Sequence, residues 1–262
     1  MEQMLLLTGV GIALTCLCTS LKWPGSNKIR WSMQLVLLAI LATIPALRAF
    51  NAGHPPFTNL YETLLLLNFL IGLRLILTPG QFVPVVRNWI IFVIAALNGI
   101  AWALPPSQKI IKPLMPALNS IWMVIHVPSY FIAYMALLIA LIQALYYYFK
   151  FKRSSKVTDN TESELRIYNR IHIEVYISFF FLLTGLWTGA IWAYYSWGNY
   201  WSWDVKETWA LINIMILSLY FFIPKKRVYF VIQLGVIILT FLSVFFTYWG
   251  VSYLLYGMHS YQ

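Results

Sequence analysis

Charged residues are scarce in this chain of 262 residues: they make up 10% of it, and only eight residues are acidic. Soluble domains carry about 25% charged residues, so the composition excludes an ordinary soluble domain. Cysteine is scarce too. Cys16 and Cys18 share one apolar run, and their spacing fits neither a disulfide framework nor a zinc motif. The sequence also has no phosphate-binding glycine loop or cysteine cluster, which removes the usual evidence for a nucleotide or metal-cluster enzyme.

Apolar residues fill 61% of the chain instead, and they form runs long enough to cross a bilayer. A transmembrane helix needs about 20 consecutive apolar residues. The sequence therefore predicts an all-α fold, a polytopic membrane helix bundle of about eight transmembrane helices. These cover residues 4–21, 33–50, 60–77, 89–104, 121–149, 171–195, 207–223 and 228–250.

Lysine and arginine alternate sharply between the connecting segments, with 14 in one set and 4 in the other. The positive-inside rule places the larger set on the inner side of the membrane. The net charge of +10 is then a topology signal and not a nucleic-acid patch. Both termini and the connection between the sixth and seventh predicted helices face outside. The outer set is Arg48, Lys109, Lys112 and Lys206.

Half of the twelve tryptophans lie within residues 184–211. An indole ring is apolar and carries one N–H donor, so it suits a membrane surface, and an aromatic belt accounts for a few such residues. Six of them, with Gly198 and a W-x-W-D-x-x-E core, favour a broad aromatic shelf for a large flat ligand such as a porphyrin. They are Trp187, Trp192, Trp197, Trp201, Trp203 and Trp209.

The segment WSWDVKETWAL, residues 201–211, resembles the WWD motif of the cytochrome c assembly proteins, which handle haem in the membrane. It is most similar to the CcsA/ResC type of system II, except that Val205 replaces the usual proline. GHPPFTNLYETLLLL, residues 53–67, resembles a second segment of that family. The resemblance implies N-terminal transmembrane helices in residues 1–52 and a WWD domain in residues 53–262, with an external haem loop at about 184–211.

The histidines are candidate ligands for haem iron. His54, His126 and His259 are predicted outside, and two neutral imidazoles facing each other suit six-coordinate haem iron. In the family, two external histidines flank the WWD loop as axial ligands of haem b. LNSIWMVIHV and YGMHSY resemble those two segments, which implies this role for His126 and His259. His54 is a weaker candidate, and no catalytic residue is identified.

Three charged residues follow the tryptophans: Asp204, Lys206 and Glu207. Charges near the hydrocarbon boundary are costly unless they are solvated or paired. In one interpretation Lys206 faces a haem propionate, while the two acids fix the loop or accept a histidine N–H. In the other, the three form an internal cluster that only shapes the loop. With the axial pair, the predicted haem-binding residues are Trp192, Trp197, Trp201, Trp203, Asp204, Lys206 and Glu207.

One departure from the family concerns the inner side of the membrane. Members commonly carry a histidine late in the seventh helix, where this chain has Phe222, and phenylalanine cannot ligate iron. His172 lies near the same membrane face and is interpreted, with Glu174, as an interfacial pair. Whether haem crosses the membrane through this chain stays open.

The resemblance implies a subunit of a cytochrome c synthase (haem lyase) in the plasma membrane of a bacterium, with a thylakoid membrane as the second choice. It would present haem for thioether attachment to a C-x-x-C-H apocytochrome c. The implied partners are a ResB/CcsB-type membrane protein, apocytochrome c, a thiol-reducing thioredoxin-like protein and the lipid bilayer, without nucleic acid. The alternatives are a CcmC-like haem delivery or export protein and a non-haem membrane transporter.

Overall fold

The computed structural model describes residue 2 and residues 5–7, 9–14, 27–78, 80–152 and 162–251. These residues are helical and contain no strand, which confirms the predicted all-α class. Seven of the described helices are long and apolar enough to cross a membrane, and they match the second to eighth predicted helices. The first prediction, 4–21, falls partly outside the described residues. Its described part is a shorter apolar helix between Leu5 and Leu14.

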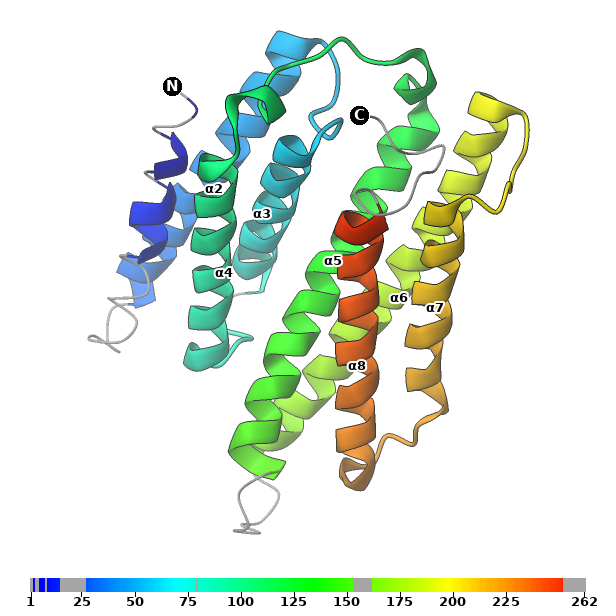
Figure 1. The fold of residues 1–262 in the computed structure, drawn as a ribbon. Coiled ribbons are helices and arrows are strands. Elements are labelled where there is room, and N and C mark those ends of the chain that lie inside the picture. Colours follow the sequence, from blue (N-terminus) through cyan, green and yellow to red (C-terminus); the bar gives the residue numbers. More distant parts are fainter. Residues whose placement is uncertain are drawn as a thin grey trace. The chain divides into compact units, whose positions relative to one another are not determined.

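The chain divides into two compact units, residues 1–118 and 119–262. In the first unit α3 packs against both α2 and α4 (Figure 1). Two short 3-10 turns, η1 and η2, follow α4. The bounds are α2 Asn27–Ala52, α3 Leu60–Leu77, α4 Pro84–Ala103, η1 Pro106–Gln108 and η2 Pro116–Leu118.

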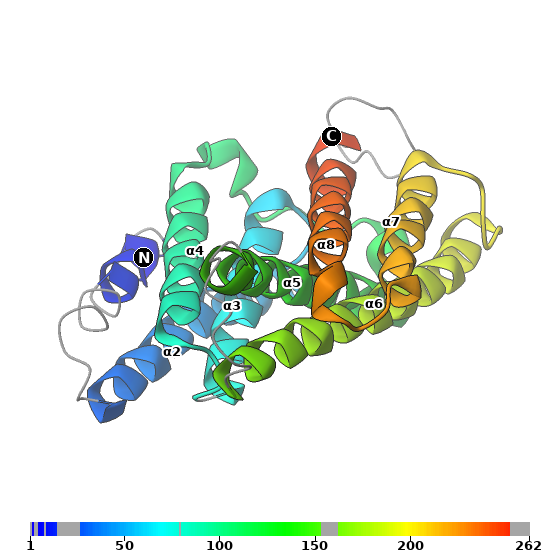
Figure 2. The same cartoon turned by 90° about the horizontal axis from the view of Figure 1, so that it is seen from below.

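The second unit holds four long helices. α5 contacts α6 and α8, and α7 contacts the same two helices, so each helix has two neighbours (Figure 2). The bounds are α5 Ile121–Tyr147, α6 Glu162–Trp197, α7 Val205–Phe222 and α8 Phe230–Phe245. Shorter elements follow α5 (η3, Tyr148–Lys152), precede α8 (η4, Arg227–Tyr229) and follow it (η5, Phe246–Gly250).

α6 begins at Glu162, well before the predicted residue 171. Glu162 and Glu164 lie in its first turn, where negative charge complements the helix dipole. Arg166 pairs with Glu162 at 2.7 Å. Glu164 pairs with Arg227 at 3.1 Å and accepts a hydrogen bond from the Tyr147 hydroxyl at 2.9 Å. These contacts extend the helix through a polar stretch that hydropathy alone assigns to a loop.

At its other end α6 continues to Trp197, so the connection to α7 is only Gly198–Asp204. Gly198 has a φ of +79°, the left-handed conformation that glycine adopts after a helix ends. Its N–H donates to the carbonyl of Tyr194 at 2.9 Å. Most of the aromatic stretch 184–211 is therefore helical, and only its middle is a loop.

Thiol labelling tests the predicted membrane sides. Asn199 and Lys226 are exposed in the connections that flank α7, so Asn199→Cys and Lys226→Cys should label from opposite sides. In a Cys16→Ser, Cys18→Ser background, a membrane-impermeant maleimide added to right-side-out vesicles should modify Asn199→Cys at once. Lys226→Cys should react only after permeabilisation. The opposite order would reverse the topology.

Candidate functional site

His126 lies in the second turn of α5 and is half-buried. Its Nδ1 is 2.8 Å from the carbonyl oxygen of Gly185 on α6. A carbonyl only accepts hydrogen bonds, so Nδ1 carries the proton and Nε2 is the unprotonated nitrogen of the neutral ring. Nε2 is therefore the atom of His126 that can ligate a metal.

Two glycines let α5 and α6 approach closely at this point. Gly185 and Gly189 are four residues apart and share one face of α6. A Cβ at Gly189 would lie 2.5 Å from His126 Nδ1, and a Cβ at Gly185 would lie 2.9 Å from the Tyr130 ring. Both rings of α5 thus rest on the backbone of α6, as small residues allow between membrane helices.

Two aromatic rings lie beside the imidazole. Tyr130 lies edge-on to His126 at a centroid distance of 5.1 Å, and Trp192 lies nearly parallel to it at 6.0 Å and 21°. Trp197 packs edge-on against Trp192 at 4.7 Å. Trp192 is only 1% exposed, so its ring supports His126 and offers no open face to a ligand.

The other two predicted haem-binding tryptophans lie in the connection between α6 and α7. Trp201 is half-buried and packs edge-on against Trp203 at 5.7 Å. Trp203 is 70% exposed and has a φ of +60°, a conformation that costs on the order of 1–3 kcal/mol for a residue other than glycine. Of the four tryptophans, Trp203 displays the most open aromatic surface.

Asp204 and Glu207 form a capping box at the start of α7. Asp204 Oδ2 accepts from the backbone N–H of Lys206 at 3.1 Å, and Glu207 Oε2 accepts from that of Asp204 at 3.2 Å. Glu207 Oε2 also accepts from the N–H and the hydroxyl of Ser202, at 2.9 and 3.1 Å. These bonds satisfy donors that the helix leaves unpaired and favour the loop-shaping interpretation for both acids.

Lys206 is half-buried in the first turn of α7. A helix start already carries partial positive charge, so a lysine there strengthens the local attraction for anions. Glu207 follows Lys206 directly in the sequence, and Asp204 lies two residues before it. The arrangement suits a negatively charged ligand group beside the connection.

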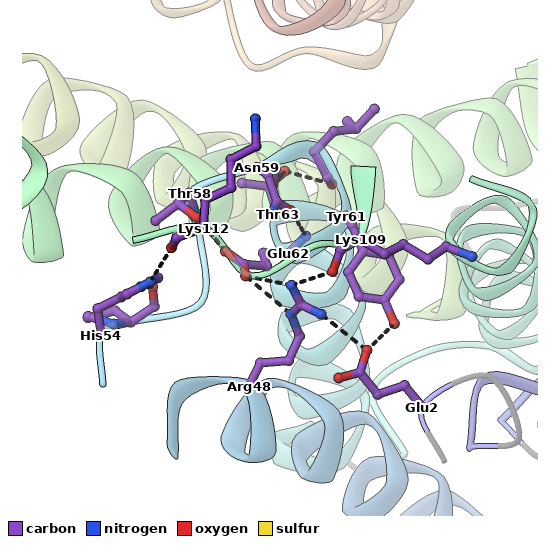
Figure 3. A network of polar contacts seen from close by, with 12 residues as sticks. Glu2, Arg48, His54, Thr58, Asn59, Tyr61, Glu62, Thr63, Lys109 and Lys112 are labelled. Atoms are coloured by element: carbon purple, nitrogen blue, oxygen red, sulfur yellow. Dashed lines mark hydrogen bonds and ion pairs between the residues drawn. The ribbon is translucent and has the colours of Figure 1, made fainter. Parts of the chain in front are cut away.

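His259, the second predicted axial ligand, lies outside the described residues. His54 is only 8% exposed, so it is not an exposed loop histidine. Its Nδ1 lies 3.0 Å from the carbonyl of Pro55, and its Nε2 lies 3.2 Å from that of Lys112 (Figure 3). Both nitrogens face carbonyls, so His54 ties two backbone segments together and is poorly placed to ligate a metal.

Glu62 follows His54 in the same family-like segment and is 1% exposed. Arg48 donates to its Oε1 from Nε and Nη2, at 3.1 and 2.9 Å, and Thr58 donates to its Oε2 from N and Oγ1 at 2.9 Å (Figure 3). Arg48 also donates to the carbonyl of Lys109 at 3.0 Å. Glu62 is therefore a buried anchor for the connection between α2 and α3. The lone outer arginine in α2 was the only sequence signal for this pair.

His172 and Glu174 are 5% and 2% exposed, so both side chains are buried in the second unit. His172 Nδ1 is 2.8 Å from the Tyr220 hydroxyl, and Tyr168 packs edge-on against the imidazole at 4.6 Å. Phe222 is 84% exposed. Tyr220, and not Phe222, is thus the residue of α7 that contacts His172.

Known proteins match most of the chain. The family model described as Cytochrome C assembly protein matches residues 57–259. The cytochrome c biogenesis protein CcsA of Chlamydomonas reinhardtii is 29% identical over 95% of this chain and 72% of its own length. The CcsA of Parasynechococcus marenigrum is 29% identical over 98% and 96%, and that of Cyanophora paradoxa is 32% identical over 82% and 81%.

Substitution of Glu207 tests the capping box. Glu207→Ala removes the acceptor of three hydrogen bonds in the connection, and we expect it to lower the free energy of unfolding by about 1 kcal/mol. Glu207→Gln keeps an acceptor oxygen and should cost less. Thermal unfolding and limited proteolysis of the connection in detergent measure the difference. Equal behaviour of Glu207→Ala and the parent protein would rule out a loop-fixing role.

Proposed function

The chain belongs to the cytochrome C assembly protein family, and on that premise we propose that it works in cytochrome c biogenesis as a membrane protein that handles haem. The relatives named cytochrome c biogenesis protein CcsA support this role. We treat haem b as a substrate that the protein holds and passes on. The held ring would lie at the outer end of the second unit.

The observation that carries this proposal is the hydrogen bond from His126 Nδ1 to the Gly185 carbonyl. Metal-ligating histidines almost always donate their second N–H to a carbonyl, a carboxylate or water, and this bond raises the basicity of the ligating nitrogen. His126 has that arrangement, with Nε2 as the nitrogen for iron. We propose His126 as one axial ligand and, from the resemblance of its segment, His259 as the other.

The porphyrin would stack on aromatic side chains of the α6–α7 connection. Trp203 has the exposed surface to stack on a flat apolar ring, and Trp201 packs against it. Trp192 would contribute by packing against His126, and Trp197 by packing against Trp192. Lys206 would face a propionate, because it adds a cation to the positive end of α7. Asp204 and Glu207 would hold that connection in place through the capping box.

We propose that the reaction served is thioether attachment to a C-x-x-C-H apocytochrome c. Each cysteine thiol adds across one vinyl group: its sulfur bonds to one vinyl carbon, and the other carbon takes a proton. The addition is redox-neutral, so the protein needs only to hold the iron, orient the vinyl edges and exclude water. The thiols must arrive reduced, so we expect a thiol-reducing thioredoxin-like protein. A ResB/CcsB-type membrane protein would complete the synthase.

A haem delivery or export protein of the CcmC type is the second candidate. It would bind haem in the same way and form no thioether bond. The names of the relatives and the sequence WSWDVKETWAL favour the synthase. A non-haem transporter is the third candidate, and the hydrogen-bonded imidazole of His126 gives no reason to prefer it.

The chain is a multi-pass membrane protein by its seven described helices of spanning length. We propose the plasma membrane of a bacterium, with the α6–α7 connection outside. The relatives from Chlamydomonas reinhardtii and Parasynechococcus marenigrum support a thylakoid membrane as the alternative. In either membrane the connection would face the compartment in which the apocytochrome receives its haem.

Holocytochrome formation tests the proposal. The chain is co-expressed with a ResB/CcsB-type partner and a C-x-x-C-H apocytochrome in a host without c-type assembly genes. We expect haem that stays on the cytochrome in a denaturing gel, and its near loss when the chain is omitted or carries His126→Ala. Product without the chain, or full product with His126→Ala, would contradict the proposal. Haem on the chain without thioether product would favour delivery.

Lys206 can be tested through haem retention. Lys206→Ala should weaken retention about tenfold, the value expected for one hydrogen bond to a charged group. Lys206→Arg keeps the cation and should retain more haem. The haem-to-protein ratio after detergent purification, measured as the pyridine haemochrome, gives the result. A ratio unchanged in Lys206→Ala would remove the propionate role and leave the loop-shaping one.

A further inference from the structure

Resting on the proposed axial role of His126, we propose that Gly185 and Gly189 are positioning residues for this ligand. The face of α6 that they form fixes both the tautomer and the plane of the imidazole before haem binds. Neither glycine touches haem in this account. Each acts through the ring that lies on it.

The tautomer depends on the carbonyl of Gly185. In water a neutral histidine ring carries its proton mostly on Nε2, which would block that nitrogen as a ligand. The 2.8 Å bond to Gly185 reverses the preference, because only a protonated Nδ1 can donate to a carbonyl. The hydroxyl of Thr188 shares the same oxygen at 3.3 Å and donates to the Thr184 carbonyl at 2.8 Å. The acceptor is therefore part of a bonded helical turn and is not free to move.

The ring plane depends on the absence of a side chain at Gly189. A Cβ there would lie 2.5 Å from Nδ1 and closer still to Cε1, but 3.5 Å from Nε2. The Nδ1–Cε1 edge of the imidazole thus rests on the helix backbone, and Nε2 is the more distant nitrogen. Any side chain at this position would push the ring away from α6. That movement would also break the bond to the Gly185 carbonyl.

Two aromatic neighbours restrict rotation of the imidazole. Tyr130 occupies the space above Gly185, where a Cβ would lie 2.9 Å from its ring, and it meets His126 edge-on at 5.1 Å. Trp192 lies nearly parallel to the imidazole. His126 and Tyr130 are four residues apart on α5, as are Gly185 and Gly189 on α6. The ring of His126 therefore packs on Gly189, and one helical turn away the ring of Tyr130 packs on Gly185. Together these contacts hold the imidazole of His126 in one orientation.

The first test needs no haem. Protein labelled with ¹⁵N-histidine and reconstituted in bilayers reports the protonated nitrogen of each ring by solid-state NMR, and comparison with His126→Gln assigns the signals of His126. We expect Nδ1–H in the parent protein and a shift toward Nε2–H in Gly189→Ala. Gly235→Ala is the matched control, because a Cβ at Gly235 of α8 meets no atom within 4 Å. It should leave the His126 signals unchanged.

An Nε2-protonated His126 in the parent protein would overturn the proposal, even if Gly189→Ala did not fold. So would a Gly189→Ala spectrum identical to that of the parent. A protein with the expected tautomer that binds no haem would contradict the proposed function and leave the positioning role intact. The two failures are therefore distinguishable.

The second test uses haem. Gly189→Ala should retain haem about tenfold less well than the parent, the lower end of the loss seen when an outer partner of a metal-ligating histidine is removed. It should also turn part of the low-spin absorption spectrum high-spin. Added imidazole should restore the low-spin spectrum, because it replaces the displaced ligand. Normal retention and spin state in Gly189→Ala would overturn the positioning role.

Discussion

The hydrogen bond between His126 and the carbonyl of Gly185 is the contact on which the packing of α5 against α6 depends. It can form only where α5 and α6 approach without intervening side chains, and Gly185 and Gly189 provide that contact. Trp192 then fills the space beside the imidazole. Membrane helices lack the hydrophobic drive that joins helices in water, so such packing and interhelical hydrogen bonds carry the association. The same contact thus holds two helices together and, in the role that we propose, orients His126 as a ligand.

Acidic residues are few in this chain, and three of the most conspicuous fix connections. Glu62 neutralises buried Arg48 and takes two bonds from Thr58. Asp204 and Glu207 cap α7. A charge near hydrocarbon is costly unless it is paired or fully hydrogen-bonded, and these acids meet that condition through backbone donors and a guanidinium group. These acids therefore fix connections between helices, each within its own unit.

The sequence predicts the helical class and seven of the spanning helices well, because hydropathy measures what the bilayer requires. It misses the start of α6, since an ion-paired polar turn such as Glu162 to Arg166 has the composition of a loop. The sequence cannot show that Trp192 is buried and Trp203 exposed, because burial depends on the face of a helix and on the neighbour across it. For the same reason the sequence does not reveal that His54 and Glu62 are buried. The four-residue spacing of Gly185 and Gly189 was visible, but their partners come from α5, about sixty residues away.

In the proposed function, the second unit holds haem through Nε2 of His126. Its most direct test is the oxidised and reduced absorption spectrum of the detergent-purified protein, compared with His126→Ala, His259→Ala and His54→Ala. We expect low-spin haem in the parent protein and in His54→Ala, because the ring of His54 faces two carbonyls. We expect high-spin or lost haem in His126→Ala and His259→Ala. An unchanged low-spin spectrum in His126→Ala, or no haem in the parent when haem is supplied, would contradict it.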